Sequence, residues 1–156
     1  MKPKQCAVVL HNIRSAQNVG AIFRTADAVG ISKIYLTGFT PQPIDRFGRK
    51  RGDIAKAALG GELYVAWEHY PKIKTLFKKL KKTGVSLVAV EQAPHALDFA
   101  KTRIDKPSAF IFGNEVRGLN HQILKKCDMV VAIPMRGKKE SLNISVAVGI
   151  ILYRFL

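Results

Sequence analysis

Short apolar runs alternate along this chain with segments whose apolar residues recur at helical spacing. The apolar runs are rich in branched residues, end near turn signals and occupy residues 7–10, 33–36, 63–65, 86–90, 109–112 and 130–133. The helical segments occupy residues 18–29, 53–59, 71–82, 119–126 and 142–155. Continuous apolar runs of this length are typical of parallel strands that are buried on both faces. The alternation therefore predicts an α/β fold with a mostly parallel sheet flanked by helices.

The length of the chain limits the number of domains. A chain of 156 residues predicts one domain with one well-filled core, and no internal repeat or low-complexity segment interrupts it. Two connections are long, residues 37–52 and residues 92–107. Connections of this length in a compact domain are usually functional or mobile.

Neither a metal site nor a membrane segment is predicted. Cys6 and Cys127 lie far apart without a CxxC motif or clustered histidines, so we expect buried thiols in or beside strands. Residues 1–12 hold a short apolar run without a small-residue cleavage site, which predicts a first strand, no signal peptide and a cytoplasmic protein. The apolar residues 142–156 are fewer than the roughly 20 that span a bilayer.

The charge balance indicates the kind of partner. Twenty-six Lys and Arg against eleven Asp and Glu leave a formal charge of +15, which is typical of a protein that binds a polyanion such as nucleic acid. Four cations in a glycine-containing turn are the best candidates for this contact: Arg46, Arg49, Lys50 and Arg51. The six lysines of residues 72–82 are ambiguous, because the same segment makes an ordinary amphipathic helix with its lysines in water.

Two polar residues lie where the last helix begins. Ser141 and Asn143 can cap the free N–H groups of that helix, or they can face a ligand beside it. The helix that follows is apolar almost all round, which indicates burial on both sides or packing across a subunit interface.

Three segments, taken in their order along the chain, form a pattern that is more specific than any single glycine motif. They are HNIRSAQNVGAIFRTADAVG (residues 11–30), FIFGNEVRGLN (residues 110–120) and IPMRGKKESLNISVAVGIILYRFL (residues 133–156). Their polar and glycine residues are Asn18, Gly20, Arg24, Gly113, Glu115, Gly118, Ser141 and Asn143. Together they resemble the SpoU/TrmH family of RNA ribose 2′-O-methyltransferases, in the SPOUT (α/β-knot) superfamily. The resemblance covers nearly the whole chain.

The resemblance implies a fold, an activity and partners. The part from about residue 110 onward would thread into a deep trefoil knot, and residues 1–156 would form a single SPOUT domain without a separate RNA-binding extension. The protein would be a homodimer with its first and last helices in the interface. It would transfer a methyl group from S-adenosyl-L-methionine to a ribose 2′-hydroxyl of structured RNA, tRNA or rRNA, without a metal ion.

The resemblance also assigns residues to roles. The expected catalytic residues are Arg24, Asn18, Glu115, Ser141 and Asn143. The expected cofactor-binding residues are Gly113, Ile133 and Leu142, and the expected RNA-binding residues are those of the basic turn. Four histidines match no family motif and are interpreted as structural or surface residues: His11, His69, His95 and His121.

Two of these assignments have a physical basis of their own. In the family the arginine is often proposed as the general base, but a guanidinium is effectively always protonated, so Arg24 needs only its charge to bind phosphate and a developing alkoxide. For Glu115 we expect an arginine partner, either Arg24 or Arg117, or an RNA hydroxyl.

Structural readings of the same residues stay open. Asn18 can be a helix N-cap, Gly113 and Gly118 can simply turn the chain, and Ser141 and Asn143 can be caps alone. The main rival function is a non-catalytic RNA-binding protein that retains the knotted fold. A nucleotide-binding oxidoreductase is not supported, because FGNEVRG (residues 112–118) is not GxGxxG.

Overall fold

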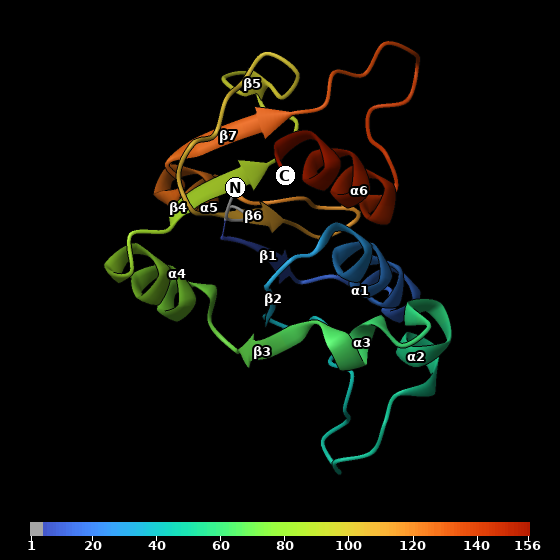
Figure 1. The fold of residues 1–156 in the computed structure, drawn as a ribbon. Helices are drawn as coiled ribbons and strands as arrows, with labels where there is room; N and C mark the ends of the chain where they lie inside the picture. The colour runs from blue at the N-terminus through green and yellow to red at the C-terminus, as the bar shows by residue number, and fades with distance from the viewer. Residues whose placement is uncertain (1–4) are drawn as a thin grey trace.

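A parallel sheet forms the centre of the computed structural model, which describes residues 5–156 (Figure 1). Within these residues the strand order is β3-β2-β1-β6-β4-β7-β5, and every neighbouring pair is parallel. The strands are β1 (Cys6–His11), β2 (Lys33–Thr37), β3 (Ala66–Tyr70), β4 (Ser86–Val90), β5 (Leu97–Asp98), β6 (Ser108–Phe112) and β7 (Met129–Ala132). The helices are α1 (Ala16–Val29), α2 (Gly52–Ala58), α3 (Gly61–Tyr64), α4 (Ile73–Lys82), α5 (His121–Lys126) and α6 (Ile144–Phe155). The predicted α/β fold is confirmed.

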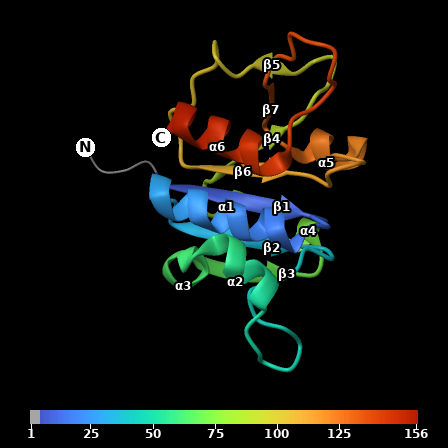
Figure 2. The same cartoon turned by 90° about the vertical axis from the view of Figure 1, so that its right-hand side faces the viewer.

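Helices cover both faces of the sheet and bury a separate apolar cluster on each. On one face α1, α2, α3 and α6 lie side by side, and residues of α1, α2 and α6 pack with one side of the central strands (Figure 2). On the other face α4 and α5 pack against the opposite side chains of the same strands. All five residues of β6 are buried, as expected for a strand between two helical layers. Among the described residues, no helix is long and apolar enough to cross a membrane.

The position of β6 determines which loops meet. It pairs with β1 on one side and with β4 on the other, although long stretches of chain separate the three strands. Because parallel strands end at the same edge, the residues after β6 lie beside those after β1 and those after β4.

One predicted strand was wrong, and one long connection holds a short strand. Residues 63–65 were predicted as a strand, but Leu63 and Tyr64 belong to α3, and β3 begins at Ala66. The apolar triplet is too short to distinguish a strand from a helical turn, and the real edge strand, AWEHY, escapes an apolar search because it carries Glu and His. The connection 92–107 holds the two-residue strand β5. The other predicted strands and helices are confirmed, with ends that differ by up to two residues.

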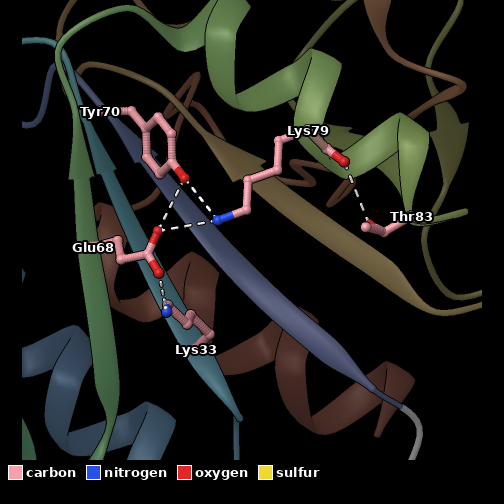
Figure 3. Close-up of polar contacts among 5 residues, drawn as sticks. All are labelled: Lys33, Glu68, Tyr70, Lys79 and Thr83. Carbon is pink, nitrogen blue, oxygen red and sulfur yellow. Dashed lines mark hydrogen bonds and ion pairs between the residues drawn. The ribbon is translucent and has the colours of Figure 1, made fainter.

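A polar network joins α4 to the edge of the sheet (Figure 3). The Glu68 carboxylate accepts from Lys33 Nζ at 2.5 Å, from Tyr70 Oη at 3.0 Å and from Lys79 Nζ at 3.3 Å. Lys79 also donates to Tyr70 Oη at 2.7 Å. The hydrogen bond from Lys33 is the main reason that the pKa of Glu68 falls to about 2. The carboxylate therefore stays ionised and holds β2, β3 and α4 together.

Candidate active site

A pocket of about 310 Å³ opens at the carboxyl edge of the sheet; we call it the edge pocket. Its walls are the residues that follow β4, β6 and β7, together with the residues that precede and begin α6. Gly113, Ile133, Ser141 and Leu142 all line it, although they come from separate parts of the sequence. The carboxyl edge of a parallel α/β sheet is the usual place for a ligand.

Gly113 is required by a close approach of the chain to itself. A Cβ atom at this position would lie 2.5 Å from the carbonyl carbon of Gly118 and 2.7 Å from the N atom of Leu119. Atoms cannot approach so closely, so a side chain here would displace the turn that closes this wall. The structural reading of Gly113 as a turning point is therefore correct, and the residue lines the edge pocket as well.

Glu115 binds backbone N–H groups at the N-terminal end of α1 and, within residues 5–156, no arginine side chain, so the predicted pairing with Arg24 or Arg117 was wrong. Its Oε2 accepts the N–H of Arg14 at 2.9 Å, and its Oε1 accepts the N–H of Ser15 at 3.0 Å. The first N–H groups of a helix have no partner within the helix and attract a carboxylate. Partial burial raises the pKa of Glu115, but these N–H donors outweigh it and hold the pKa below its usual value.

Asn18 links the first segment to the other two. Its Nδ2 donates to Glu115 Oε1 at 3.3 Å, and its Oδ1 accepts from Asn143 Nδ2 at 3.3 Å. Asn18 is not the N-cap of α1; that position is Ser15, whose hydroxyl accepts the N–H of Asn18 at 3.1 Å. Glu115, Asn18 and Asn143 thus form a chain of hydrogen bonds beside the edge pocket.

The two polar residues that were predicted at the start of α6 have different roles. Asn143 is the N-cap, and its Oδ1 accepts the N–H of Ser145 at 2.9 Å, so the helix begins at Ile144 and not at Leu142. Ser141 lies outside the helix and lines the edge pocket. Within residues 5–156 its hydroxyl has no hydrogen-bond partner, which leaves it available to a ligand.

Arg24 is the one expected catalytic residue that does not reach this site. It follows Asn18 by six residues on α1, which corresponds to about 9 Å along the helix axis. Its side chain is exposed, does not line the edge pocket and pairs with no carboxylate among residues 5–156. The structure therefore brings Asn18, Glu115 and Asn143 together with the pocket residues and leaves Arg24 on the outer surface of α1.

The basic turn lies at the end of the molecule occupied by α2 (Figure 1), and none of its four cations lines the edge pocket. Two of its cations already have carboxylate partners, because Arg49 pairs with Asp45 at 3.0 Å and Arg51 pairs with Asp53 at 2.6 Å. The guanidiniums of Arg46 and Arg49 lie 4.8 and 4.9 Å from the ring centroid of Phe47.

Among the edge-pocket residues that sequence reasoning missed are two polar residues after β4. Glu91 and Gln92 follow β4 and line the pocket. Glu91 Oε2 accepts the N–H of Leu119 at 2.8 Å, and Gln92 Nε2 donates to the carbonyl of Ile133 at 2.7 Å. The one available signal in the sequence was that these two polar residues directly follow a buried strand. This signal points to the pocket only when β4 is known to lie beside β6 and β7, and the sequence does not give that strand order.

Comparison with known proteins places this geometry in a family. The model of the SpoU rRNA Methylase family matches residues 5–153. An uncharacterized tRNA/rRNA methyltransferase of Archaeoglobus fulgidus is 34% identical over 92% of this chain and 61% of its own length. A tRNA (guanosine(18)-2′-O)-methyltransferase of Thermus thermophilus is 32% identical over 94% of this chain and 71% of its own. The chain thus spans about two thirds of the length of these relatives.

Solved structures give the same result for the fold. The AdoMet-bound rRNA methyltransferase of Sinorhizobium meliloti has a TM-score of 0.85 and 28% identity, over 96% of this chain and 55% of that one. A TrmH/SpoU tRNA modifying enzyme of Aquifex aeolicus has a TM-score of 0.83 and 29% identity, over 97% of this chain and 73% of that one. Sequence and structure therefore agree that this chain belongs to the SpoU rRNA methylase family.

Proposed function

We propose that this protein transfers a methyl group from S-adenosyl-L-methionine to a ribose 2′-hydroxyl of structured RNA, tRNA or rRNA. One observation carries the proposal: two of the three segments line one pocket, and Asn18 of the first segment is hydrogen-bonded to Glu115 and Asn143 beside it. The printed names of the relatives, which include tRNA and rRNA methyltransferases, support the same reaction.

The edge pocket fits the cofactor in size and chemistry. Its volume of about 310 Å³ is within the range of small-molecule sites, about 300–1,000 Å³. Gly113, Ile133 and Leu142 would hold the cofactor through main-chain groups and apolar contact, while the unpartnered Ser141 hydroxyl offers a polar contact. When bound, S-adenosyl-L-methionine supplies an electrophilic methyl group on a sulfonium ion.

The residues beside the pocket position the ribose. Glu115 is ionised, and its oxygens accept the backbone N–H groups of Arg14 and Ser15 at the start of α1. Its role is therefore to orient the helix and not to transfer a proton. This fixes Asn18, whose amide is held at both ends by Glu115 and Asn143. A rigid amide and the free Ser141 hydroxyl can then align the 2′-oxygen with the methyl group, which is the main requirement of an in-line displacement.

We propose that two copies of the chain associate through the outer surfaces of α1, α3 and α6. These helices lie side by side (Figure 2), and large apolar residues are exposed on two of them. Leu63 and Tyr64 of α3 are 70% and 74% exposed, and Tyr153 of α6 is 68% exposed. Arg24 lies on α1 between them, so dimerisation would bring its charge toward the other protomer, where it can bind the phosphate beside the target ribose and a developing alkoxide.

We further propose that the single domain of residues 1–156 is threaded as the trefoil knot of the family. Support comes from the strand order, since β7 lies beyond β4 while α6 returns to pack on α1. The segment 133–143 must therefore cross back over the carboxyl edge. A cytoplasmic location stays a prediction of the sequence.

The basic turn is proposed to contact RNA outside the pocket. Replacing all four of its cations by alanine should flatten the dependence of RNA affinity on salt by up to about 0.7 to 0.9 per lost phosphate contact. Affinity for the cofactor should not change, because none of the four lines the edge pocket. An unchanged salt dependence would move the RNA contact to another surface.

The decisive experiment measures cofactor binding and methyl transfer in parallel. Calorimetry with S-adenosyl-L-methionine and with its demethylated product should show one site per protomer. Methylation of total tRNA and of rRNA should then yield alkali-resistant 2′-O-methyl positions. RNA binding without binding of either ligand at millimolar concentration would support the non-catalytic rival and refute the methyltransferase.

A further inference from the structure

A second hollow lies next to the edge pocket, on the other side of the turn formed by residues 114–118. This side hollow has a volume of about 630 Å³ and is lined by residues that follow β1, by Phe39 after β2, and by the start of α5. It shares Asn114, Val116 and Gly118 with the edge pocket. Only this one turn of chain therefore separates the two spaces.

The wall on the β1 side is held in an unusual conformation. Asn12 has a φ of +54°, in the left-handed region that costs free energy for a residue other than glycine. Its N–H donates to the Thr37 carbonyl at 3.1 Å, and its Oδ1 accepts the N–H of Phe39 at 3.1 Å. Gly38 has a φ of +63°, and a Cβ there would collide with Asn12 Oδ1. The strained contact holds the backbone of Phe39 at the rim of the side hollow.

The opposite wall is fastened to the same residue. Asn114 Nδ2 donates to the Asn12 carbonyl at 2.8 Å, while Asn114 Oδ1 accepts the N–H groups of Val116 and Arg117 at 3.0 and 2.9 Å. Two asparagines thus connect the wall that carries Phe39 with the wall that carries Arg117. These hydrogen bonds hold the two walls of the side hollow in place.

His11 lines the side hollow but its ring is already engaged. Its Nδ1 lies 2.9 Å from Thr37 Oγ1, and its Nε2 lies 3.3 Å from Asn12 Nδ2. Since Asn12 Oδ1 accepts from Phe39, the amide NH₂ must donate to Nε2, which assigns the proton of the neutral ring to Nδ1. Burial lowers the pKa of His11, so the ring is neutral at neutral pH and serves as a structural brace.

The groups left for a ligand are two guanidiniums and an aromatic ring. Arg14 and Arg117 have exposed side chains that pair with no carboxylate among residues 5–156. The Glu115 carboxylate is already occupied by the backbone N–H groups of Arg14 and Ser15. Phe39 is 62% exposed, although its backbone is tightly held.

We propose that the side hollow binds the RNA nucleotide that neighbours the methylated one, with its base stacked on Phe39 and its phosphate held by Arg14 and Arg117. Arginine pairs with phosphate, and unstacked RNA bases bind on aromatic side chains. The inference rests on the proposed function. Phe39 also lines a third hollow that contains Arg46, Lys50 and Arg51, so the RNA strand can continue from the edge pocket past Phe39 to the basic turn.

RNA affinity measured against salt tests the two kinds of contact separately. With total tRNA and total rRNA as probes, Phe39→Ala should weaken binding by about tenfold, with the salt dependence unchanged and with rescue by Phe39→Trp. The double variant Arg14→Gln with Arg117→Gln removes one phosphate contact and should lower the slope of log affinity against log salt by about 0.7 to 0.9. The matched control removes the same charge from the exposed end of α5, Lys125→Gln with Lys126→Gln, and should leave binding nearly unchanged.

Two controls keep the outcomes distinct. Every variant should bind the demethylated cofactor as the wild type does, because Phe39 and the two arginines do not line the edge pocket. If the wild-type protein binds no cofactor, the proposed function is refuted. A wild type that methylates RNA, beside variants with unchanged affinity and slope, overturns the side hollow alone. If a variant does not fold, photo-crosslinking of 4-thiouridine RNA to the wild type decides: crosslinks at Phe39 or Arg117, which line the side hollow and not the edge pocket, support the site, and their absence refutes it.

Discussion

Glu115→Gln tests the contact that joins the second family motif to α1. The carboxylate uses both oxygens: Oε2 accepts the N–H of Arg14, and Oε1 accepts the N–H of Ser15 and the amide of Asn18. Glutamine keeps the shape but offers one oxygen and an NH₂ group that cannot accept. If the amide oxygen takes the place of Oε1, the Arg14 N–H keeps only its longer contact of 3.2 Å; in the other orientation Ser15 and Asn18 lose their acceptor. In both cases the charge opposite the helix is removed.

The geometry sets the size of the effect. A hydrogen bond to a charged group contributes about 1.5–3 kcal/mol, against about 0.5–1.5 kcal/mol between neutral groups, and a negative charge at a helix N-terminus adds about 0.3–1 kcal/mol. Because Glu115 is only partly buried, the low end applies. We expect the variant to lose about 1–2 kcal/mol of unfolding free energy.

The pKa of Glu115 adds a second signature. The native pKa lies below the usual value of 4.5, so its contribution is complete above that value and is lost as pH falls through the native pKa. The stability gap between wild type and Glu115→Gln should therefore be full at neutral pH and should close in acid. Loss of the anchor of Asn18 should also slow methyl transfer at saturating cofactor and RNA.

Urea unfolding followed by circular dichroism at neutral and acidic pH measures the gap. With a slope of about 2 kcal/mol per molar urea, the midpoint should fall by roughly 0.5–1 M without a change of slope. Asp105→Asn is the matched control, because Asp105 is exposed and has no hydrogen-bond partner within residues 5–156; its effect should stay within about 0.5 kcal/mol. Equal stability of the two variants at neutral pH, or a gap that acid leaves intact, would refute the reasoning.

Three further predictions concern single residues. Arg24→Ala should slow single-turnover methyl transfer by about 10²–10³-fold, and Arg24→Lys should retain part of the rate. Cofactor affinity should stay constant because Arg24 does not line the edge pocket, and a wild-type rate for Arg24→Ala would show that Arg24 has no part in the mechanism. Gly113→Ala should lose about 1–3 kcal/mol in unfolding and weaken cofactor binding in calorimetry, whereas Gly137→Ala, where a Cβ meets nothing within 4 Å, should do neither. Glu68→Gln should lower the free energy of unfolding by about 1 kcal/mol at neutral pH, since the fall of the Glu68 pKa from 4.5 to about 2 corresponds to roughly 3 kcal/mol before solvent screening of this 38%-exposed side chain. Thermal melts should show this difference shrinking as pH falls from about 4.5 toward 2, and a constant difference would contradict the prediction.

The sequence by itself determined the parts of this protein that depend on local pattern. Continuous apolar runs indicated β1, β2, β4, β6 and β7, and helical spacing indicated α1, α4 and α6, because burial on one or both faces leaves a period that can be read along the chain. The three segments that resemble the family likewise identified the residues that line or border the edge pocket, since a motif preserves residue type and spacing.

Only the tertiary structure decided which distant groups meet. Insertion of β6 between β1 and β4 brings Glu115 to the amides of α1, where the sequence suggested an arginine. The same topology leaves Arg24 on the outer surface and places Phe39 and Arg117 on opposite walls of one hollow. A polar group takes the nearest donor that its fold provides, and the order of strands in a sheet leaves no periodic signal in the chain, so these partners followed from the fold alone.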